Sequence, residues 1–285
     1  MPVNSILFSV RKMDARYINN NMVLENTECF DVGLSLDCGQ AFRWRKNENG
    51  VWYGIACGKY LEIKQDGNTV TLFNTTPEDF ENCWRKYFDL DRDYKAITES
   101  YTEENLRRAC EAYPGIRILN QEPWEAVCSF IISANNNIPR IKGIIERLCE
   151  NFGEKTNGGY TFPAPERLKD LTVEDLSPIR AGFRAKYIID AAQRFANGEV
   201  DPEVIKTLGF DEAKAQLLKI KGVGEKVAQC SLLYGFSRVE AFPVDVWVKR
   251  ILSEMYPNGL PECVKGTEGI AQQYLFHWRR QGVEN

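Results

Sequence analysis

The chain has 285 residues, of which 44% are hydrophobic, and this is enough to bury one large core or a core with a smaller appended domain. No run of about 18 apolar residues occurs, which excludes a single apolar helix that spans a membrane. The formal net charge is −4, so a nucleic-acid partner would have to be bound by local basic patches rather than by overall charge.

The nine cysteines are scattered along the chain, and no two of them form a Cys-x-x-Cys pair. An odd number of unpaired thiols is typical of an intracellular protein, in which cysteines stay reduced. Residues 1–21 lack both a long apolar stretch and a small-residue cleavage site. We therefore expect no secretory signal, and a cytoplasmic location.

Residues 30–75 have the patterns of β-strands. Apolar and polar residues alternate along residues 30–36, which indicates a half-buried strand. Turn signals separate further short apolar runs, at residues 42–44, 51–56, 60–63 and 70–73. We predict an antiparallel sheet of about five strands.

Helical spacing replaces this alternation from Thr76 and Pro77 onward, where a capping threonine precedes a proline at the first helical position. The main helical segments are residues 123–134, 141–153, 211–220 and 225–235. We therefore predict an α+β fold. An antiparallel sheet domain that contributes to substrate recognition occupies residues 1–100, and a helical domain occupies residues 101–285.

The segment 217–228, Leu-Leu-Lys-Ile-Lys-Gly-Val-Gly-Glu-Lys-Val-Ala, joins two of the predicted helices through a very short link. Gly222 and Gly224, on either side of Val223, supply the backbone angles and the lack of side chains that a tight turn needs. Free N–H groups at the start of the second helix suit a phosphate. The pattern is typical of a helix-hairpin-helix motif that binds the DNA backbone, although a plain helix-loop-helix can have the same glycines.

Lys226 lies in the first turn of the second helix, where the positive end of the helix dipole disfavours a cation. An amine at this place is a candidate nucleophile, and a surface lysine is the structural alternative. Asp245 follows 19 residues later, which fits one helix, a loop and the start of the next helix. As the N-cap of a helix over residues 246–255, Asp245 would be rigidly aimed, which is compatible with both capping and catalysis.

The hairpin, the lysine and the Pro243-Val244-Asp245 sequence together resemble the helix-hairpin-helix–Gly-Pro-Asp DNA glycosylase superfamily, in which the lysine marks the bifunctional glycosylase/lyase members. Within it, the chain resembles the 8-oxoguanine DNA glycosylase family along nearly its whole length. Three further segments match that family in the right order: Cys38-Gly39-Gln40-Ala41-Phe42-Arg43-Trp44, Arg117-Ile118-Leu119-Asn120-Gln121-Glu122-Pro123 and Ser133-Ala134-Asn135-Asn136-Asn137-Ile138-Pro139-Arg140.

The resemblance implies a DNA-repair enzyme that flips 8-oxoguanine out of the duplex, preferably from opposite cytosine, and excises it. Lys226 would attack C1′ of the sugar and form a Schiff base, which makes the enzyme both an N-glycosylase and an apurinic/apyrimidinic lyase. Asp245 would stabilise the developing oxocarbenium ion and help to activate the nucleophile.

The same resemblance implies a pocket for the flipped lesion. Gly39 would accept a hydrogen bond from N7–H through its backbone carbonyl, and Gln272 would bind the Watson–Crick edge. Phe276 and Cys230 would sandwich the base. The spacing agrees in part, because Gln272 and Phe276 lie four residues apart, on one face of a predicted helix.

The resemblance also implies contacts with the remaining DNA. Asn135 would fill the gap that the flipped base leaves. Arg140 and Arg184 would hold the orphaned cytosine, with Phe183 wedged beside it. The hairpin residues 222–224 would bind the phosphate backbone.

Three positions depart from the family pattern. Phe183 and Trp247 stand where a tyrosine and a phosphate-contacting histidine are common, which puts opposite-base strictness and one phosphate contact in doubt. Cys38 replaces a common serine. Because only Cys263 follows Cys230, the closely spaced cysteines of the iron–sulfur relatives are missing, and we expect neither a metal nor another cofactor.

Two alternatives remain open at this point. A glycosylase for alkylated purines has the same fold, but such enzymes generally lack the lysine. A non-catalytic helix-hairpin-helix DNA-binding protein would have no use for Lys226 or Asp245. The expected partner is double-stranded DNA with an oxidised guanine, and the protein is expected to be a monomer without membrane contact. It would be nucleoid-associated in a bacterium and nuclear in a eukaryote.

Overall fold

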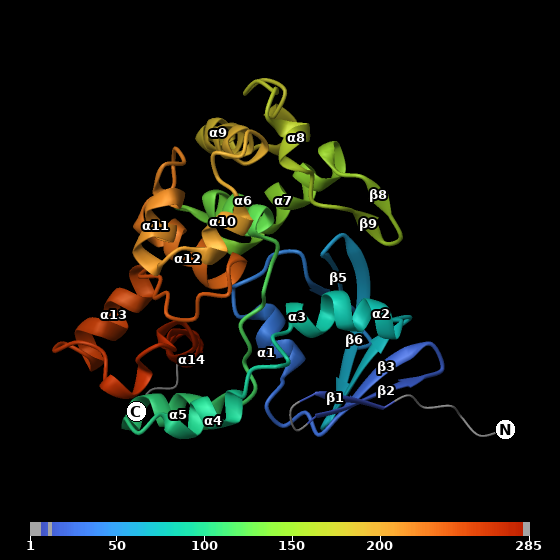
Figure 1. The fold of residues 1–285 in the computed structure, drawn as a ribbon, viewed down its shortest axis with the longest axis vertical. Coiled ribbons are helices and arrows are strands. Elements are labelled where there is room, and N and C mark those ends of the chain that lie inside the picture. The colour runs from blue at the N-terminus through green and yellow to red at the C-terminus, as the bar shows by residue number, and fades with distance from the viewer. Residues whose placement is uncertain (1–6, 11–12, 282–285) are drawn as a thin grey trace. The chain divides into compact units, whose positions relative to one another are not determined.

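The structure is a computed structural model that describes residues 7–10 and 13–281, and the chain forms two compact units (Figure 1). Unit 1 consists of Met1–Gly54, Leu61–Asn120 and Val244–Asn285, and unit 2 consists of Ile55–Tyr60 and Gln121–Pro243. Unit 1 is discontinuous, because the chain leaves it after Asn120 and returns to it at Val244. The functional domains predicted at residues 1–100 and 101–285 are a different division of the chain, which stays a prediction.

An antiparallel sheet lies mainly in unit 1, and only its residues 55–60 belong to unit 2. Its strands are β1 (Leu7–Val10), β2 (Met13–Ile18), β3 (Asn21–Glu25), β4 (Arg45–Lys46), β5 (Trp52–Ala56), β6 (Lys59–Asp66) and β7 (Thr69–Phe73). The sheet order is β1-β2-β3-β7-β6-β5-β4, and pairs such as β3–β7 and β6–β7 run antiparallel. The predicted antiparallel sheet followed by a helical body is confirmed, with seven strands where about five were expected.

The strands predicted at residues 51–56, 60–63 and 70–73 are present as β5, β6 and β7. Side chains alternate between buried and partly exposed along β3 and β7, as expected for strands with one face on a core. Strands β1, β2 and β3, which lie within the first 25 residues, were not predicted from the sequence.

The first predicted strand is wrong, because Val32–Asp37 form helix α1. The Asp31 carboxylate caps this helix by accepting a hydrogen bond from the Leu34 N–H at 2.7 Å. Val32 and Leu36 are buried four positions apart, which is a helical spacing. An apolar residue at every second position includes residues four apart, so the pattern alone fits both structures, and the N-cap favours the helix.

The segment 42–44, also predicted as a strand, is irregular, and the chain pairs only from Arg45 onward, in β4. Trp44 is buried in an aromatic cluster, in which the rings of Trp84, Tyr87 and Phe88 have their centroids 5.9–6.4 Å from that of Trp44. Its Nε1–H donates a hydrogen bond to the Tyr87 hydroxyl at 2.7 Å. The segment is therefore held by the burial of a large aromatic side chain whose N–H is hydrogen-bonded, and not by pairing with another strand.

The helices of unit 1 come from two distant parts of the sequence. They are α1, α2 (Pro77–Asp79), a π-helical turn (Phe80–Trp84), α3 (Arg85–Tyr87), α4 (Tyr94–Ser100), α5 (Glu104–Ala112), α13 (Val246–Met255), a 3-10 turn (Glu262–Val264) and α14 (Glu268–Arg280). Helix α14 packs on α5 and α13, and its Tyr274 hydroxyl donates to the Ile116 carbonyl at 3.1 Å. These contacts hold the C-terminal helix in the same unit as the sheet.

Unit 2 is mainly helical. Its elements are α6 (Pro123–Ser133), α7 (Ile138–Phe152), β8 (Lys155–Thr156), β9 (Gly159–Tyr160), α8 (Pro165–Leu168), two 3-10 turns (Ser177–Ile179 and Gly182–Arg184), α9 (Ala185–Ala196), α10 (Pro202–Thr207), α11 (Phe210–Leu218) and α12 (Glu225–Gly235). Every residue of α6 from 126 to 132 is buried, and α6 packs on α12. Gly235 permits this close packing, since a Cβ there would lie 2.9 Å from the Cβ of Ala126.

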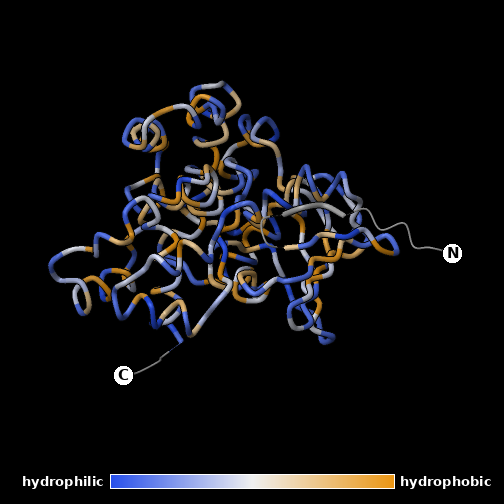
Figure 2. Tube along the Cα trace, turned by 60° about the horizontal axis from the view of Figure 1, so that its bottom comes forward, coloured by the Kyte–Doolittle hydropathy of each residue, from blue (hydrophilic) through white to orange (hydrophobic). Residues whose placement is uncertain are grey.

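The predicted helices of this part of the chain are confirmed as α6, α7, α11 and α12, and α7 ends at Gly153 as expected. Figure 2 shows hydrophobic residues recurring along the helices and strands, whereas many of the projecting turns are hydrophilic. Among the described residues, no helix combines the length and apolar character needed to cross a membrane.

Candidate active site

Lys226 is the second residue of α12 and is half-buried. Its Nζ lies 3.4 Å from the Ser133 hydroxyl and 5.2 Å from the centroid of the Phe130 ring, and both of these residues belong to α6. Within the described part of the chain, no carboxylate pairs with this amine. Lys226 therefore faces a hydroxyl and an aromatic ring instead of an acid, an arrangement that leaves the amine available as a nucleophile.

The predicted hairpin is present between α11 and α12, and its two glycines have different surroundings. Gly222 has a φ of +83°, and a Cβ added there would lie 2.4 Å from the Tyr187 ring. Gly224 is the N-cap of α12 with a φ of −100°, and a Cβ there would meet no atom within 4 Å. Val223, between them, is 7% exposed and anchors the link. The first glycine is thus required by the fold, whereas the second leaves open space at the helix start.

The turn that follows α6 connects Lys226 with two other predicted site residues. Asn135 is exposed on this turn with a φ of +49°, a conformation that asparagine tolerates better than most residues. Arg184 is 2% exposed and donates from Nε to the Ala134 carbonyl at 3.0 Å and from Nη2 to the Asn135 carbonyl at 2.9 Å. Since Ser133 contacts Lys226, one short turn brings the lysine, the asparagine and the arginine together.

Phe183 and Arg140 are the exposed members of the predicted opposite-base group. Phe183 is 56% exposed, with the Arg184 guanidinium 4.4 Å from its centroid and the Tyr187 ring edge-on at 6.2 Å. The Arg140 guanidinium is exposed and makes no ion pair with any described residue. Burial, together with the nearby Arg140 cation, lowers the pKa of Arg184.

Asp245 caps α13, as the sequence predicted. Its Oδ1 accepts a hydrogen bond from the Val248 N–H at 2.8 Å, and Oδ2 bonds to none of the described residues. Trp247 is 41% exposed in the first turn of α13, with the Arg250 guanidinium 5.2 Å from its ring centroid. The capped carboxylate is therefore fixed through one oxygen, and the other oxygen is available.

Gln229 connects α12 with the segment that leads to this aspartate. Its side-chain oxygen accepts a hydrogen bond from the Phe242 N–H at 3.0 Å. Phe242 is followed by Pro243, which has no N–H to donate. A side chain of α12, the helix that carries Lys226, therefore binds the Phe242 N–H, the last backbone N–H before the Pro243-Val244-Asp245 sequence.

A buried glutamine next to Gly39 holds the loop that carries this glycine. Gln40 is fully buried, and its Nε2 donates to the Ser35 carbonyl at 2.8 Å and to the Arg117 carbonyl at 2.7 Å. Its Oε1 accepts from the Leu119 N–H at 2.9 Å. Gly39 itself has a φ of +89°, which favours glycine at this position. The Gly39 backbone is thus fixed by polar contacts that the motif alone does not reveal.

Helix α14 contacts the same loop, because Gln273 donates from Nε2 to the Cys38 carbonyl at 3.3 Å. Gln272 is 6% exposed, and its buried side-chain oxygen has no hydrogen-bond partner among the described residues. Phe276 is half-buried one turn further along α14.

Burial raises the pKa of the Cys38 thiol to about 12, so this group stays protonated. Cys230, the other predicted pocket residue, is buried on α12 in unit 2.

The predicted residues thus fall into two groups, one in each unit. Unit 1 carries Gly39, Asp245, Gln272 and Phe276. Unit 2 carries Asn135, Arg140, Phe183, Arg184, Gly222, Val223, Gly224, Lys226 and Cys230. The predicted nucleophile and the predicted DNA contacts therefore belong to the helical unit, whereas most of the residues predicted to bind the lesion belong to the unit with the sheet.

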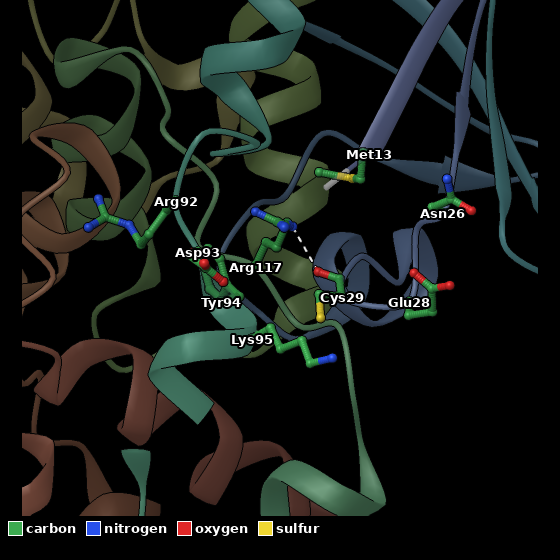
Figure 3. Close-up of a pocket in the computed structure, with 9 residues that line it drawn as sticks. All are labelled: Met13, Asn26, Glu28, Cys29, Arg92, Asp93, Tyr94, Lys95 and Arg117. Carbon is green, nitrogen blue, oxygen red and sulfur yellow. Dashed lines mark hydrogen bonds between the residues drawn. The ribbon is translucent and has the colours of Figure 1, made fainter. Parts of the chain in front are cut away.

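A separate cavity of about 310 Å³ in unit 1 is drawn in Figure 3, and none of the predicted site residues lines it. Arg117 lies in its wall, donates to the backbone carbonyls of Cys29 at 2.9 Å and Asp89 at 2.6 Å, and stacks on Tyr94 with 4.5 Å to the ring centroid. This arginine therefore braces the chain segments around the cavity. Over residues 7–10 and 13–281, no group of three or more His, Cys, Asp or Glu side chains could hold a metal ion.

Comparison with known proteins agrees with this geometry. A family profile described as the 8-oxoguanine DNA glycosylase N-terminal domain matches residues 22–127, and one described as an HhH-GPD superfamily base excision DNA repair protein matches residues 128–262. A probable N-glycosylase/DNA lyase of Methanothermobacter thermautotrophicus is 33% identical over 299 aligned positions, which cover 89% of this chain and 95% of that protein. The chain belongs to the 8-oxoguanine DNA glycosylase family.

Solved structures agree with the family. The 8-oxoguanine glycosylase/lyase of Clostridium acetobutylicum in its apo-form is 37% identical, has a TM-score of 0.88, and covers 95% of this chain and all of its own. The same enzyme in complex with double-stranded DNA containing cytosine opposite 8-oxoguanine has a TM-score of 0.84 and covers 99% of each chain. A 3-methyladenine DNA glycosylase of Archaeoglobus fulgidus shares only the fold, at 20% identity over 92% of this chain with a TM-score of 0.71. Alkylated-purine glycosylases are therefore distant relatives.

The residues that hold the predicted ones in place were not identified from the sequence. Gln40 and Ser133 lie inside the motifs that match the family, so their position in the sequence was a usable signal. Gln229 and Gln273 lie outside those motifs, and their partners Phe242 and Cys38 are 13 and 235 residues away in the sequence. Polar contacts over such distances leave no periodic pattern.

Proposed function

We propose that this protein is a bifunctional DNA N-glycosylase and DNA lyase that removes 8-oxoguanine from double-stranded DNA, preferably from opposite cytosine. The observation that carries the proposal is the setting of Lys226, a half-buried amine directly after the hairpin, with Ser133 and Phe130 as its contacts and no described acid beside it. A purely DNA-binding protein has no use for such an amine. Membership of the 8-oxoguanine DNA glycosylase family supports the same substrate.

In the proposed reaction, the Lys226 amine attacks C1′ of the flipped nucleotide, and the bond from C1′ to the base breaks. The base leaves with the bonding electron pair and gains a proton. The amine then loses a proton, the C1′–O4′ bond of the sugar breaks, O4′ takes up a proton, and the C1′=N double bond of the Schiff base forms. Asp245, through its unpaired Oδ2, stabilises the positive charge that develops on the sugar. Loss of a proton from C2′ of the Schiff base then expels the 3′-phosphate as the C3′–O bond breaks, which cuts the strand. Water finally hydrolyses the C=N bond and releases the lysine.

Lesion recognition is proposed for Gly39, Gln272, Phe276 and Cys230. The buried, unpaired oxygen of Gln272 is the strongest single support, because a buried acceptor without a partner is costly unless a ligand satisfies it. A base edge that donates hydrogen bonds would do so. Phe276 and Cys230 offer flat and soft apolar surfaces for its two faces.

Contacts with the duplex are proposed for Asn135, Arg140, Phe183 and Arg184, and for the hairpin residues 222–224. Exposure of Asn135, Arg140 and Phe183 supports these roles. Arg184 already donates to the carbonyls of residues 134 and 135, so we propose that it positions Asn135 and shares its remaining donors with the orphaned cytosine. We further propose that the protein acts as a monomer, in the compartment that holds the DNA.

Trapping with borohydride tests the proposal. A duplex with 8-oxoguanine opposite cytosine is incubated with the protein and sodium borohydride, which reduces a Schiff base to a stable cross-link. The parent protein is expected to cross-link, and Lys226→Gln is expected to lose the cross-link and base excision while it still binds the duplex. Lys219→Gln is the matched control, because Lys219 lies in the same hairpin and its Nζ bonds only to Gln216 within the described structure, at 2.8 Å. Normal excision by Lys226→Gln would refute the assignment of the nucleophile.

A further inference from the structure

Asp190 is a buried carboxylate on α9, and both of its oxygens are used. Oδ2 accepts from the Lys221 backbone N–H at 2.9 Å and from Arg194 Nε at 3.0 Å. Oδ1 lies 3.1 Å from Lys221 Nζ. The Asp190 side chain is only 10% exposed. Such a group is costly to bury unless its hydrogen bonds are all made, as they are here.

The hairpin residue that Asp190 holds is the one directly before Gly222. Tyr187, three residues before Asp190 on α9, packs against Gly222 so closely that a Cβ would lie 2.4 Å from its ring. Residues three apart lie on the same face of a helix, so one face of α9 contacts the two consecutive hairpin residues Lys221 and Gly222. The conformation of the link between α11 and α12 is therefore set from outside the hairpin.

The charge of Asp190 has the wrong sign for a residue next to a phosphate-binding motif. A carboxylate near a DNA-binding hairpin opposes binding through its charge. Arg194 offers an internal comparison, because it also pairs with Glu199, from Nη1 at 2.8 Å. Glu199 thus shares the arginine with Asp190, but within the described structure it makes no hydrogen bond or ion pair with the hairpin residues 219–224.

We propose that Asp190 is a positioning residue that fixes the hairpin so that the N–H groups of residues 222–224 meet a DNA phosphate. The proposal rests on the proposed DNA-binding role of the hairpin. Its consequence is a change of sign: charge alone predicts that removal of Asp190 strengthens DNA binding, whereas positioning predicts that removal weakens it.

The test compares Asp190→Ala with Glu199→Ala by fluorescence anisotropy, on an undamaged duplex and on one with 8-oxoguanine opposite cytosine. Each variant removes one carboxylate from Arg194, and only the first removes a hairpin contact. Asp190→Ala is expected to raise the Kd about tenfold on both duplexes, the scale for loss of a hydrogen bond to a charged group. Glu199→Ala is expected to bind like the parent or slightly tighter. Binding by Asp190→Ala as tight as by Glu199→Ala would overturn the proposal.

Three further measurements separate positioning from a merely structural role. Asp190→Asn keeps an oxygen that can accept from the Lys221 N–H, so it is expected to restore most of the affinity that Asp190→Ala loses. Hydrogen exchange of the Lys221 amide in the parent protein needs no variant to fold, and protection is expected; free exchange would overturn the proposal. Borohydride trapping at saturating DNA is expected to persist in Asp190→Ala. If the parent itself bound no DNA and gave no trap, the proposed function would fail instead.

Discussion

The two hairpin glycines are expected to respond in opposite ways to the same small substitution. In Gly222→Ala, the new residue must keep a φ of +83°, which costs an L-residue about 1–2 kcal/mol. Its Cβ would also lie 2.4 Å from the Tyr187 ring, and overpacking of this kind costs about 1–3 kcal/mol. The free energy of unfolding should therefore fall by about 2–5 kcal/mol, a large part of the total stability of a typical domain.

Gly224→Ala is the matched variant in the same hairpin. Its φ of −100° suits alanine, and no atom lies within 4 Å of the added Cβ, so the stability should fall by less than about 1 kcal/mol. The Cβ would instead occupy the space in which the proposed phosphate approaches the helix start. We therefore expect Gly224→Ala to lose DNA affinity with its fold intact.

The assay combines urea unfolding with anisotropy on an undamaged duplex. A double-mutant cycle with Tyr187→Ala isolates the contact, because without the ring the cost of Gly222→Ala should shrink to the backbone part, about 1–2 kcal/mol. The reasoning is refuted if Gly222→Ala is as stable as Gly224→Ala, or if removal of the Tyr187 ring leaves the cost of Gly222→Ala unchanged.

Four other outcomes are expected. Asp245→Asn should slow single-turnover excision by about a hundredfold or more, with a stability loss of about 1 kcal/mol; a sharp drop in thermal stability with excision unchanged would make Asp245 only a cap. Excision should be faster opposite cytosine than opposite adenine, because Arg140 and Arg184 donate to the acceptor edge of cytosine, and equal rates would remove that role. A duplex with 8-bromoguanine should bind like one with guanine and resist excision, since its N7 stays an acceptor that the Gly39 carbonyl repels at a cost of about 1–3 kcal/mol; efficient excision would mean that the shape at C8 is recognised instead. Burial opposes ionisation of Asp190, but its hydrogen bonds with the Lys221 N–H and Arg194 outweigh burial and lower its pKa, so the stability that the ionised carboxylate contributes is lost as the pH falls. The difference in Tm between the parent and Asp190→Asn should therefore shrink on going from pH 6 to about pH 3. A difference that stays constant would contradict this role of the carboxylate.

The sequence allowed the architecture to be predicted where a pattern repeats locally. The helices around the hairpin, the cap at Asp245 and the strands β5–β7 were all predictable, since capping residues, glycines and apolar spacing act within a few residues. The helix at 32–37 was not, because a two-residue and a four-residue repeat coincide in so short a segment, and Asp31 was not read as its cap. Trp44 shows a different limit, since its partners in the aromatic cluster lie about forty residues further on.

In the candidate site too, some residues could be predicted from the sequence and others could not. Chemistry-bearing residues such as Lys226 could be named from the sequence, because motif and resemblance mark them. Their supports could not, because a buried amide or carboxylate reveals its partner only in three dimensions. Asp190 illustrates this, since its partner Lys221 lies 31 residues away, in the link between α11 and α12. The sequence therefore identifies candidate reactive residues more easily than it identifies the residues that hold them in position.

The discontinuity of unit 1 has a consequence for the order in which the molecule becomes complete. During synthesis from the N-terminus, the sheet and its first helices leave the ribosome before the whole of unit 2, yet they must wait for Val244–Asn285 to finish their own unit. That last segment brings Asp245, Gln272 and Phe276, whereas Lys226 and the hairpin are made earlier. The residues proposed to bind the DNA backbone are thus synthesised before Asp245, Gln272 and Phe276, so a nascent chain that has only unit 2 lacks part of the proposed active site.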